Sequence, residues 1–277
     1  MGMNGSCGAG AELMMTQEED WLALNGTICF ESNDLLREVA PFPPAHLMQI
    51  VSGLTSEVDF AAHGVTIYRA IRDASPKPIS EYRSILDFGC GCGRLSRLFK
   101  GHPGKVTGCD IDGRLVDWIN DHLSYMTAVR TEPNATLPFD NQSFDAIISI
   151  SVFSHLDEES QKLYLRELSR VASSGAYLFL TIHGERAIAR ALEEERIFKM
   201  LEIPGAALEN ATTGMREGRH NFIVQGSGHL TTDDYKYGIT FIPAEYVKQN
   251  WSEYFEIVDI VSGAIHDFQD IVVCRKR

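Results

Sequence analysis

Short apolar runs recur through the middle of the chain and alternate with stretches of helical spacing. Each run, bounded by turn residues, is typical of a strand buried in a sheet. The predicted strands cover residues 84–88, 105–110, 126–130, 144–150 and 176–182. Apolar residues at helical spacing predict helices near 92–100, 113–122 and 158–171. Strands that alternate with helices in this order predict an α/β fold with a parallel sheet.

The N-terminal part of the chain follows other patterns. Residues 1–16 are rich in glycine and methionine without any period, which predicts a flexible tail. Residues 17–80 predict an N-terminal helical cap, because their apolar positions have approximately helical spacing. These positions are Val58, Ala61, Ala62, Val65, Ile67 and Ile71. Residues 81–277 then form the predicted core domain.

One long segment interrupts the core. Residues 184–238 break the alternation of strands and helices. Segments of this length inside a compact domain are usually lids or binding elements, so we predict an inserted lid that contacts the substrate. A helix near 243–251 and two strands near 254–258 and 269–276 complete the predicted sheet.

A glycine-rich turn follows the first predicted strand. The strand ends at Asp87, and the turn places glycines at alternate positions, Gly89, Gly91 and Gly93. Glycine lets the backbone turn sharply and approach a ligand closely. A helix that begins near Arg94 would direct its N–H groups toward that ligand.

The end of the second predicted strand indicates which class of ligand the turn would bind. It ends at Asp110, about twenty residues beyond the turn, where a carboxylate can accept both ribose hydroxyls of an adenosine. A dinucleotide fingerprint would place glycine or alanine where this chain has Ser96. The spacing therefore favours an adenosine ligand that has no pyrophosphate.

Further segments follow in a recognisable order. Leu137-Pro138-Phe139 precedes Phe144-Asp145 at the start of the fourth strand, a helix and fifth strand follow, and two strands close the chain. On these segments, spread over residues 84–276, the chain resembles the class I S-adenosylmethionine-dependent methyltransferases of the small-molecule type. The resemblance implies a Rossmann-like methyltransferase fold, with a seven-stranded, mostly parallel sheet and a C-terminal antiparallel hairpin. It also implies S-adenosyl-L-methionine as the cofactor.

The cofactor residues follow from the resemblance and from the chemistry of the ligand. The glycine turn and Asp87 would hold the amino acid end, Asp110 the ribose, and Ile111 and Asn134 the adenine. The end of the fourth strand would face the methyl group. The predicted cofactor-binding residues are Asp87, Gly89, Cys90, Gly91, Gly93, Asp110, Ile111, Asn134, Ser149, Ile150 and Ser151.

Two histidines are candidates for a catalytic base. Methyl transfer is a direct displacement, for which the protein aligns an acceptor, excludes water and, for a hydroxyl acceptor, removes a proton. His155 follows the fourth strand and His183 ends the fifth, and histidine titrates near neutrality. The alternative is structural: His155 would cap the next helix and His183 would hold the turn at Gly184.

The insertion supplies candidate acceptor-binding residues. Arg216 and Arg219 could pair with an acceptor carboxylate, or could simply be solvated. The predicted substrate residues are Arg216, Arg219, His220, His229, Tyr235 and Tyr237. The spacing of His220 and His229 is not typical of a metal site, so we predict no metal.

Charge and cysteine content limit the classes of partner and the cellular compartment that we expect. The formal net charge is −13, whereas nucleic-acid surfaces need clustered lysine and arginine, so we predict a small-molecule acceptor and no nucleic acid. The sequence lacks a long apolar span and a signal-like segment, which predicts no membrane partner. Two of the six cysteines lie in the glycine turn, which favours the reducing cytoplasm.

The expected activity is methyl transfer from S-adenosylmethionine to an oxygen, nitrogen, sulfur or activated carbon atom of a small molecule. Two alternatives remain. A catalytically idle partner protein would keep the glycines and Asp110 without turnover. An NAD-linked oxidoreductase would share the first two motifs, but it would require the missing fingerprint glycine.

Overall fold

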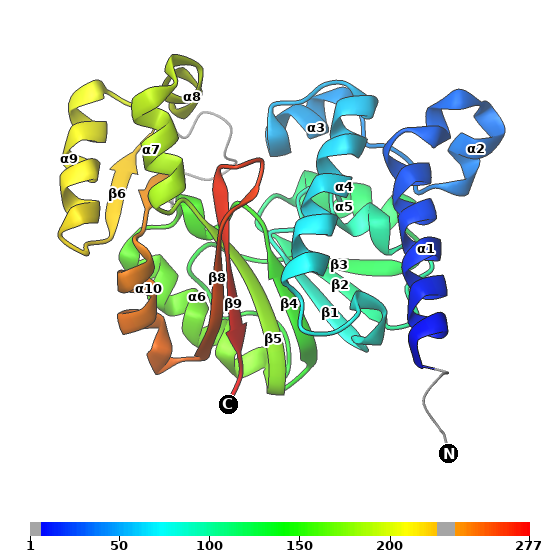
Figure 1. The fold of residues 1–277 in the computed structure, drawn as a ribbon. Coiled ribbons are helices and arrows are strands. Elements are labelled where there is room, and N and C mark those ends of the chain that lie inside the picture. The colour runs from blue at the N-terminus through cyan, green and yellow to red at the C-terminus, as the bar shows by residue number, and fades with distance from the viewer. Residues whose placement is uncertain (1–6, 226–235) are drawn as a thin grey trace.

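The computed structural model of the protein describes residues 7–225 and 236–277, with a seven-stranded sheet at the centre (Figure 1). The strands lie in the order β3-β2-β1-β4-β5-β9-β8. They are β1 (Ser84–Phe88), β2 (Lys105–Asp110), β3 (Met126–Arg130), β4 (Phe144–Ser149), β5 (Ala172–Ile182), β8 (Glu256–Ile265) and β9 (Gln269–Arg275). The first five are parallel, and β9 is antiparallel to both β5 and β8. The predicted Rossmann-like sheet and its C-terminal hairpin are confirmed.

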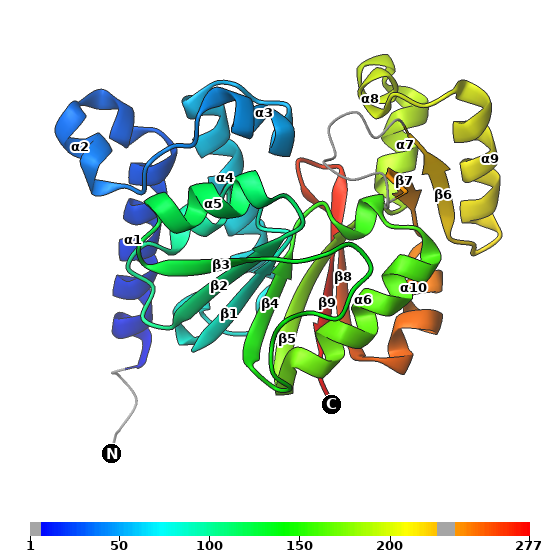
Figure 2. The same ribbon diagram turned by 180° about the vertical axis from the view of Figure 1, so that it is seen from behind.

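Helices cover both faces of this sheet (Figure 2). Along β1, Ile85 packs on one face with α4 (Glu57–Ala74) and α5 (Gly113–His122), while Leu86 packs on the other with α6 (Glu158–Val171). Successive strand residues point to opposite faces, so a strand covered on both sides must be apolar throughout. This explains why the predicted strands are continuous apolar runs.

The N-terminal helices differ from the prediction at one boundary. Helix α1 runs continuously over Cys7–Gly26, so the expected end of an irregular tail at residue 16 does not coincide with an element boundary. Residues 11–19 contain alanine, leucine, methionine, glutamine and glutamate, which all favour helix. Further short helices, η1 (Ile28–Glu31), α2 (Asn33–Glu38) and α3 (Ala45–Ser52), lead from α1 to α4.

The prediction of a helix near residues 92–100 was wrong. A turn occupies the first half of this segment, and only Ser96–Phe99 forms a short 3-10 helix, η3. Gly91 and Gly93 adopt positive φ angles of 54° and 87°, which a right-handed helix does not contain. The ligand-facing groups here are therefore those of a turn rather than of an α-helix N-terminus.

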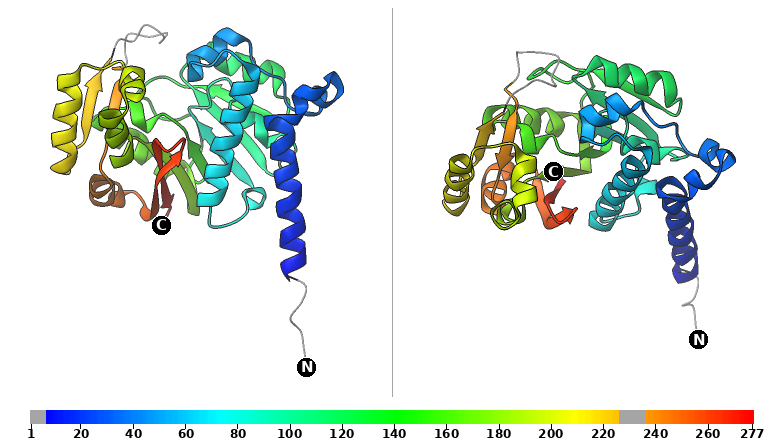
Figure 3. Two further views of the ribbon diagram at one scale, coloured as in Figure 1. Left: turned by 45° about the horizontal axis from the view of Figure 1, so that its top comes forward. Right: turned by 90° about the horizontal axis from the view of Figure 1, so that it is seen from above.

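The described residues of the insertion form a layer beside the sheet. It contains α7 (Glu185–Glu193), α8 (Glu195–Leu201), α9 (Gly205–Arg216) and β6 (Asn221–Val224), and β6 pairs with β7 (Gly238–Phe241). These elements share an apolar cluster of their own. Figure 3 shows that the insertion and the N-terminal helices lie at opposite ends of the molecule. Helix α10 (Ala244–Asn250) and the short helix η5 (Trp251–Glu253) then return the chain to the sheet.

None of the described helices is both long enough and apolar enough to cross a membrane.

Helix α4 packs directly on the turn after β1 at Gly64. A Cβ atom at Gly64 would lie 2.7 Å from the backbone oxygen of Arg94. Glycine to alanine inside a helix normally stabilises a protein by about 0.5–1 kcal/mol. We expect Gly64→Ala instead to lower the free energy of unfolding by about 1–3 kcal/mol, because backbone atoms must move apart. Urea unfolding measures the change.

Gly205 at the start of α9 gives the matched control. Its added Cβ would meet nothing closer than the Cζ atom of Phe198 at 4.0 Å. Gly205→Ala should therefore leave the free energy of unfolding unchanged or slightly higher. Equal effects of the two substitutions would contradict the close packing of α4 on the turn.

Candidate active site

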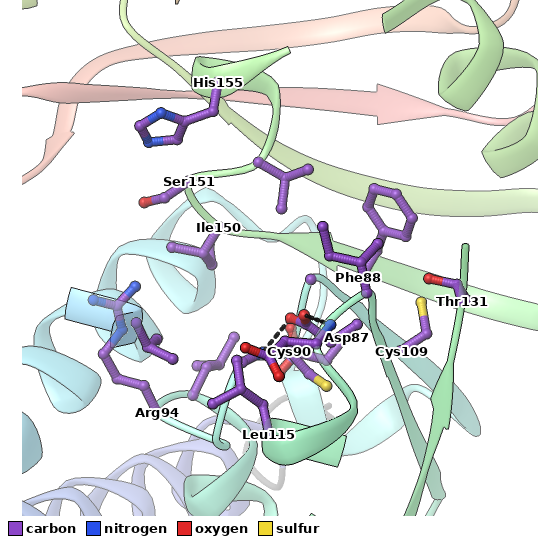
Figure 4. Close-up of a pocket in the computed structure, with 18 of the residues that line it drawn as sticks. Asp87, Phe88, Cys90, Arg94, Cys109, Leu115, Thr131, Ile150, Ser151 and His155 are labelled. Carbon is purple, nitrogen blue, oxygen red and sulfur yellow. Dashed lines mark hydrogen bonds between the residues drawn. The ribbon is translucent and has the colours of Figure 1, made fainter. Parts of the chain in front are cut away.

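A cavity of about 230 Å³ opens at the carboxyl ends of β1, β2 and β4 (Figure 4). Open α/β sheets bind their ligands at this edge. The turn after β1, the end of β2 and the segment after β4 form most of its wall, and α3 and α4 close one side. The predicted cofactor residues on this wall are Asp87, Gly89, Cys90, Gly91, Asp110, Ile111, Ile150 and Ser151.

The turn after β1 needs glycine for its shape and for space. Gly89 has a φ of 76°, and a Cβ atom there would collide with the side chain of Val152. A Cβ atom at Gly91 would lie 2.9 Å from two carbons of Val51 in α3. The backbone N–H groups of Gly89 and Cys90 both donate to the carbonyl oxygen of Cys109, at 2.9 and 3.0 Å. The turn is thus held against β2 with its backbone exposed to the cavity.

Asp110 links the end of β2 to the same turn. Its Oδ2 accepts a hydrogen bond from the N–H of Gly91 at 2.8 Å, and its Oδ1 accepts one from the N–H of Asp112 at 3.0 Å. Burial raises the pKa of the Asp110 carboxyl. Each carboxylate oxygen can accept a further hydrogen bond, so Asp110 can both hold the turn and receive ligand hydroxyls.

Asp87 is a second buried acid on the cavity wall. The hydroxyl of Ser96 donates to its Oδ2. Burial, with a smaller contribution from the charge of Asp110, raises the pKa of Asp87 to about 6. The site therefore holds two carboxylates that a cationic ligand group would stabilise in the charged form.

The raised pKa of Asp87 predicts a dependence of stability on pH. The native side chain keeps its proton to about pH 6, whereas the ordinary pKa of an aspartate is 3.8. Between these values the native state binds more protons, so the free energy of unfolding falls as the pH rises. Asp87→Asn should reduce that fall by up to about 3 kcal/mol, as measured by urea unfolding at about pH 4 and pH 7.

Some slope should remain in the Asp87→Asn variant, because burial also raises the pKa of Asp270 to about 6. The exposed Asp117 supplies a control, since Asp117→Asn should leave the whole profile unchanged. An identical profile for wild type and Asp87→Asn would contradict the burial of an acid at this position.

A polar group lies at the end of β4. Ser151 has a φ of 59°, and its N–H donates to the Thr181 hydroxyl at 2.7 Å. Its own hydroxyl accepts a hydrogen bond from the Gln269 amide at 2.8 Å. These contacts from β5 and β9 hold a left-handed residue at the cavity wall, where the sequence predicted the methyl position.

The two candidate bases occupy different places. His155 lines the cavity, its Nδ1–H donates to the carbonyl oxygen of Gly238 at 2.8 Å, and its ring stacks on Tyr237 with centroids 4.9 Å apart. His183 lies behind that wall, with 3% of its surface exposed. Burial lowers the pKa of His183 to about 3, and its ring lies 6.1 Å from the His155 ring. Of the two, His155 is the one placed to meet a ligand.

Three predicted cofactor residues lie outside the wall. Gly93 packs toward Leu123, and Ser149 is fully buried and does not line the cavity. The backbone N–H of Asn134 donates to the Tyr164 hydroxyl at 3.0 Å. Tyr164 itself and Thr131 line the cavity.

Among the predicted acceptor residues, Tyr237 lines the cavity and three others do not. Arg216 and Arg219 are exposed, and Arg219 pairs with Glu217. His220 is half-buried beside Tyr246. The structure therefore does not bring Arg216, at the end of α9, or Arg219, beyond that helix, to the cavity wall. His229 and Tyr235 lie outside the described residues.

Several wall residues were not predicted. Ile50, Val51 and Ile67 come from α3 and α4, and only the tertiary fold brings these helices to the sheet edge. Arg94 also lines the cavity, and its position directly after Gly93 was a usable signal. Within 7–225 and 236–277, no group of three or more potential ligand side chains is placed to hold a metal ion.

Comparison with known proteins agrees with this geometry. Residues 86–180, from β1 to β5, match the protein family described as "Methyltransferase domain". The chain is 29% identical over 114 residues to "Probable tRNA methyltransferase 9B" of Mus musculus, covering 41% of this chain and 24% of that protein. It is 24% identical over 174 residues to "Ajmaline N-methyltransferase" of Rauvolfia serpentina, covering 56% and 58%.

A solved structure extends the match across the fold. The S-adenosylmethionine dependent methyltransferase from Mesorhizobium loti superposes with a TM-score of 0.50 at 14% identity, covering 76% of this chain and 97% of that chain. This likeness shows the fold alone. The chain spans about a quarter of the Mus musculus protein that it matches.

Proposed function

We propose, from the premise that residues 86–180 form a methyltransferase domain whose cofactor is S-adenosylmethionine, that this chain methylates a small-molecule acceptor. One observation carries the proposal. The glycine turn and Asp110 meet in a single cavity with His155 and Tyr237, so a nucleoside subsite and a subsite with a possible base are continuous. A domain that merely bound the cofactor would have no need of the second subsite.

The residues present suit the cofactor. Asp110 would accept the ribose hydroxyls, Ile111 would pack on the adenine, and the turn at Gly89 and Gly91 would approach the amino acid end. Asp87 would face the ammonium group, which favours its ionised form. When bound, the cofactor supplies a methyl group on a sulfonium, which is transferred by direct displacement.

The chain then has to orient and deprotonate the acceptor. Ser151 and Ile150 border the place where the acceptor would meet the methyl group. The Nδ1–H of His155 donates to Gly238, which fixes the ring at the cavity wall, and we assign Nε2 as the atom that takes an acceptor proton. Closure of the wall by α3 and α4 would exclude water.

The comparisons do not decide between a small-molecule acceptor and a nucleic acid, because the relatives include proteins named for tRNA and for a small-molecule substrate. Other observations favour a small molecule. The formal charge of −13 opposes contact with phosphate groups. The insertion brings Tyr237 to the cavity, and we assign it a part in acceptor choice. The buried thiols of Cys90, Cys92 and Cys109 suit the reducing cytoplasm.

A labelled-methyl screen tests the proposal. The protein is incubated with methyl-labelled S-adenosylmethionine and separate panels of phenols, amines, thiols, 2-oxo acids and total tRNA. We expect label on a member of the small-molecule panels. Label on tRNA alone would overturn the choice of acceptor. Tight binding of adenosylhomocysteine without transfer to any panel would favour the idle partner protein, and tighter binding of NAD would favour the oxidoreductase.

A further inference from the structure

Arg94 is a buried arginine that faces the candidate active site. It is 8% exposed, lines the cavity, and extends from the turn toward the side where Ile150 and Ser151 lie (Figure 4). Its guanidinium makes no ion pair with any of the residues that the structure describes. Its one hydrogen bond there joins Nη1 to the Nδ1 atom of His63, at 3.0 Å. A buried charge without a counter-charge is costly unless a ligand completes the pair.

The partner of Arg94 is held in place but supplies no negative charge. His63 lies on α4, and its ring stacks on His266 at the tip of the β8–β9 hairpin, with centroids 4.1 Å apart and an interplanar angle of 6°. Burial and the nearby Arg94 lower the pKa of His63 to about 3, so the ring is neutral and accepts the hydrogen bond. His63 therefore orients the guanidinium without adding negative charge, and Asp87 attracts Arg94 only at longer range, without an ion pair.

Two other guanidiniums, buried Arg97 and partly buried Arg170, are satisfied by the protein. Arg97 lies one turn further along the chain and donates to the carbonyl oxygens of Ala40 and Pro41. It also lies over the ring of Phe42, 3.5 Å from the centroid. Arg170 pairs with Glu167 at 2.8 Å. Compared with these, Arg94 has N–H donors directed into the cavity rather than into the fold.

We propose that Arg94, oriented by His63, binds a carboxylate inside the candidate active site. The planar guanidinium fork matches a carboxylate in bidentate geometry. The carboxylates of Asp87 and Asp110 in the same cavity favour a ligand group of single charge over a phosphate. This inference rests on the proposed function, because the carboxylate belongs either to the amino acid end of the cofactor or to the acceptor.

A pair of nucleosides distinguishes the first source. Adenosylhomocysteine carries the carboxylate, and 5′-methylthioadenosine shares the adenosine and lacks it. If the cofactor supplies the group, calorimetric titration of Arg94→Met should show adenosylhomocysteine binding about ten- to a hundredfold weaker, with methylthioadenosine unchanged. Arg94→Lys should give an intermediate loss. Arg114→Met is the control, because Arg114 is exposed and pairs with Asp112.

A pair of aromatic probes distinguishes the second source. In the presence of saturating adenosylhomocysteine, benzoate is compared with benzamide, its neutral analogue. If the acceptor supplies the carboxylate, wild type should prefer benzoate by tenfold or more, and Arg94→Met should lose the preference. No change in either pair would overturn the inference. Failure of wild type to bind either nucleoside would instead overturn the proposed function. The comparison of benzoate with benzamide, repeated without nucleoside, would still support the inference if Arg94→Met lost the preference.

Thermal unfolding separates binding from folding. Replacing a buried charge that has no ion pair in the protein with an apolar side chain of similar size is often neutral or stabilising. The ligand-free Arg94→Met variant should therefore unfold at the same or a higher temperature than wild type. A lower unfolding temperature, together with equal losses for both nucleosides, would make Arg94 a structural residue and overturn the assignment.

Discussion

Replacing His155 with alanine is expected to lower turnover of a hydroxyl acceptor by about 10²–10⁴-fold, the usual contribution of a general base. The ring borders the cavity, and its Nδ1–H is engaged by Gly238, so proton transfer would run through Nε2. Binding of adenosylhomocysteine should stay within about twofold of wild type, since His155 would act on the acceptor. Steady-state kinetics and calorimetric titration together measure the two quantities.

Substitution of His183 in a parallel experiment tests which of the two histidines is the general base. His183 lies behind the wall, and its lowered pKa makes it a poor proton acceptor near neutrality. His183→Ala should therefore change turnover far less than His155→Ala, after correction for the fraction of folded protein. A large loss confined to His183→Ala would reverse the assignment. Wild-type turnover in both variants would mean that alignment of the acceptor carries the reaction.

Asp110→Ala is expected to weaken adenosylhomocysteine binding by about 1.5–3 kcal/mol, because a charge-assisted contact to the ribose hydroxyls is lost. The same carboxylate accepts the N–H of Gly91, so the turn should also lose rigidity. Calorimetric titration with adenosylhomocysteine measures the change. The loss should appear equally with 5′-methylthioadenosine, which keeps the ribose.

Asp117→Ala provides the control for Asp110→Ala, because Asp117 is an exposed acid on α5. Thermal unfolding of each variant separates a local loss of binding from a loss of fold. An unchanged dissociation constant in well-folded Asp110→Ala would remove Asp110 from the site. A loss for adenosylhomocysteine with none for methylthioadenosine would place the contact at the amino acid end.

The parts of the fold that the sequence predicts are those determined by local patterns. The core strands are apolar on both faces, so their runs stand out at β1 and β4 without any knowledge of their partners. The glycine spacing likewise predicts the turn, because positive φ at Gly91 is a local requirement.

The features that the sequence did not predict depend on contacts between distant segments or on which face of a helix is exposed. No sequence pattern near Arg94 indicates that α4 packs against the Arg94 backbone at Gly64. Nor does any pattern indicate that His63 forms a hydrogen bond with the Arg94 guanidinium. Arg216 at the end of α9 is exposed, since a helix has several faces and composition does not say which one meets the cavity. For the same reason the sequence pointed to Asn134 and not to Thr131 and Tyr164, which line the cavity.

Residues inside and outside the segment that matches the methyltransferase family both line the cavity. The part matched by the methyltransferase family supplies the turn and Asp110, whereas Ile50, Val51, Ile67 and Tyr237 come from outside residues 86–180. A chimera that grafted residues 86–180 into a relative would carry over the machinery for the nucleoside and leave behind these four side chains. Such a transplant should keep the recipient's choice of acceptor, so the two properties can diverge independently along a lineage.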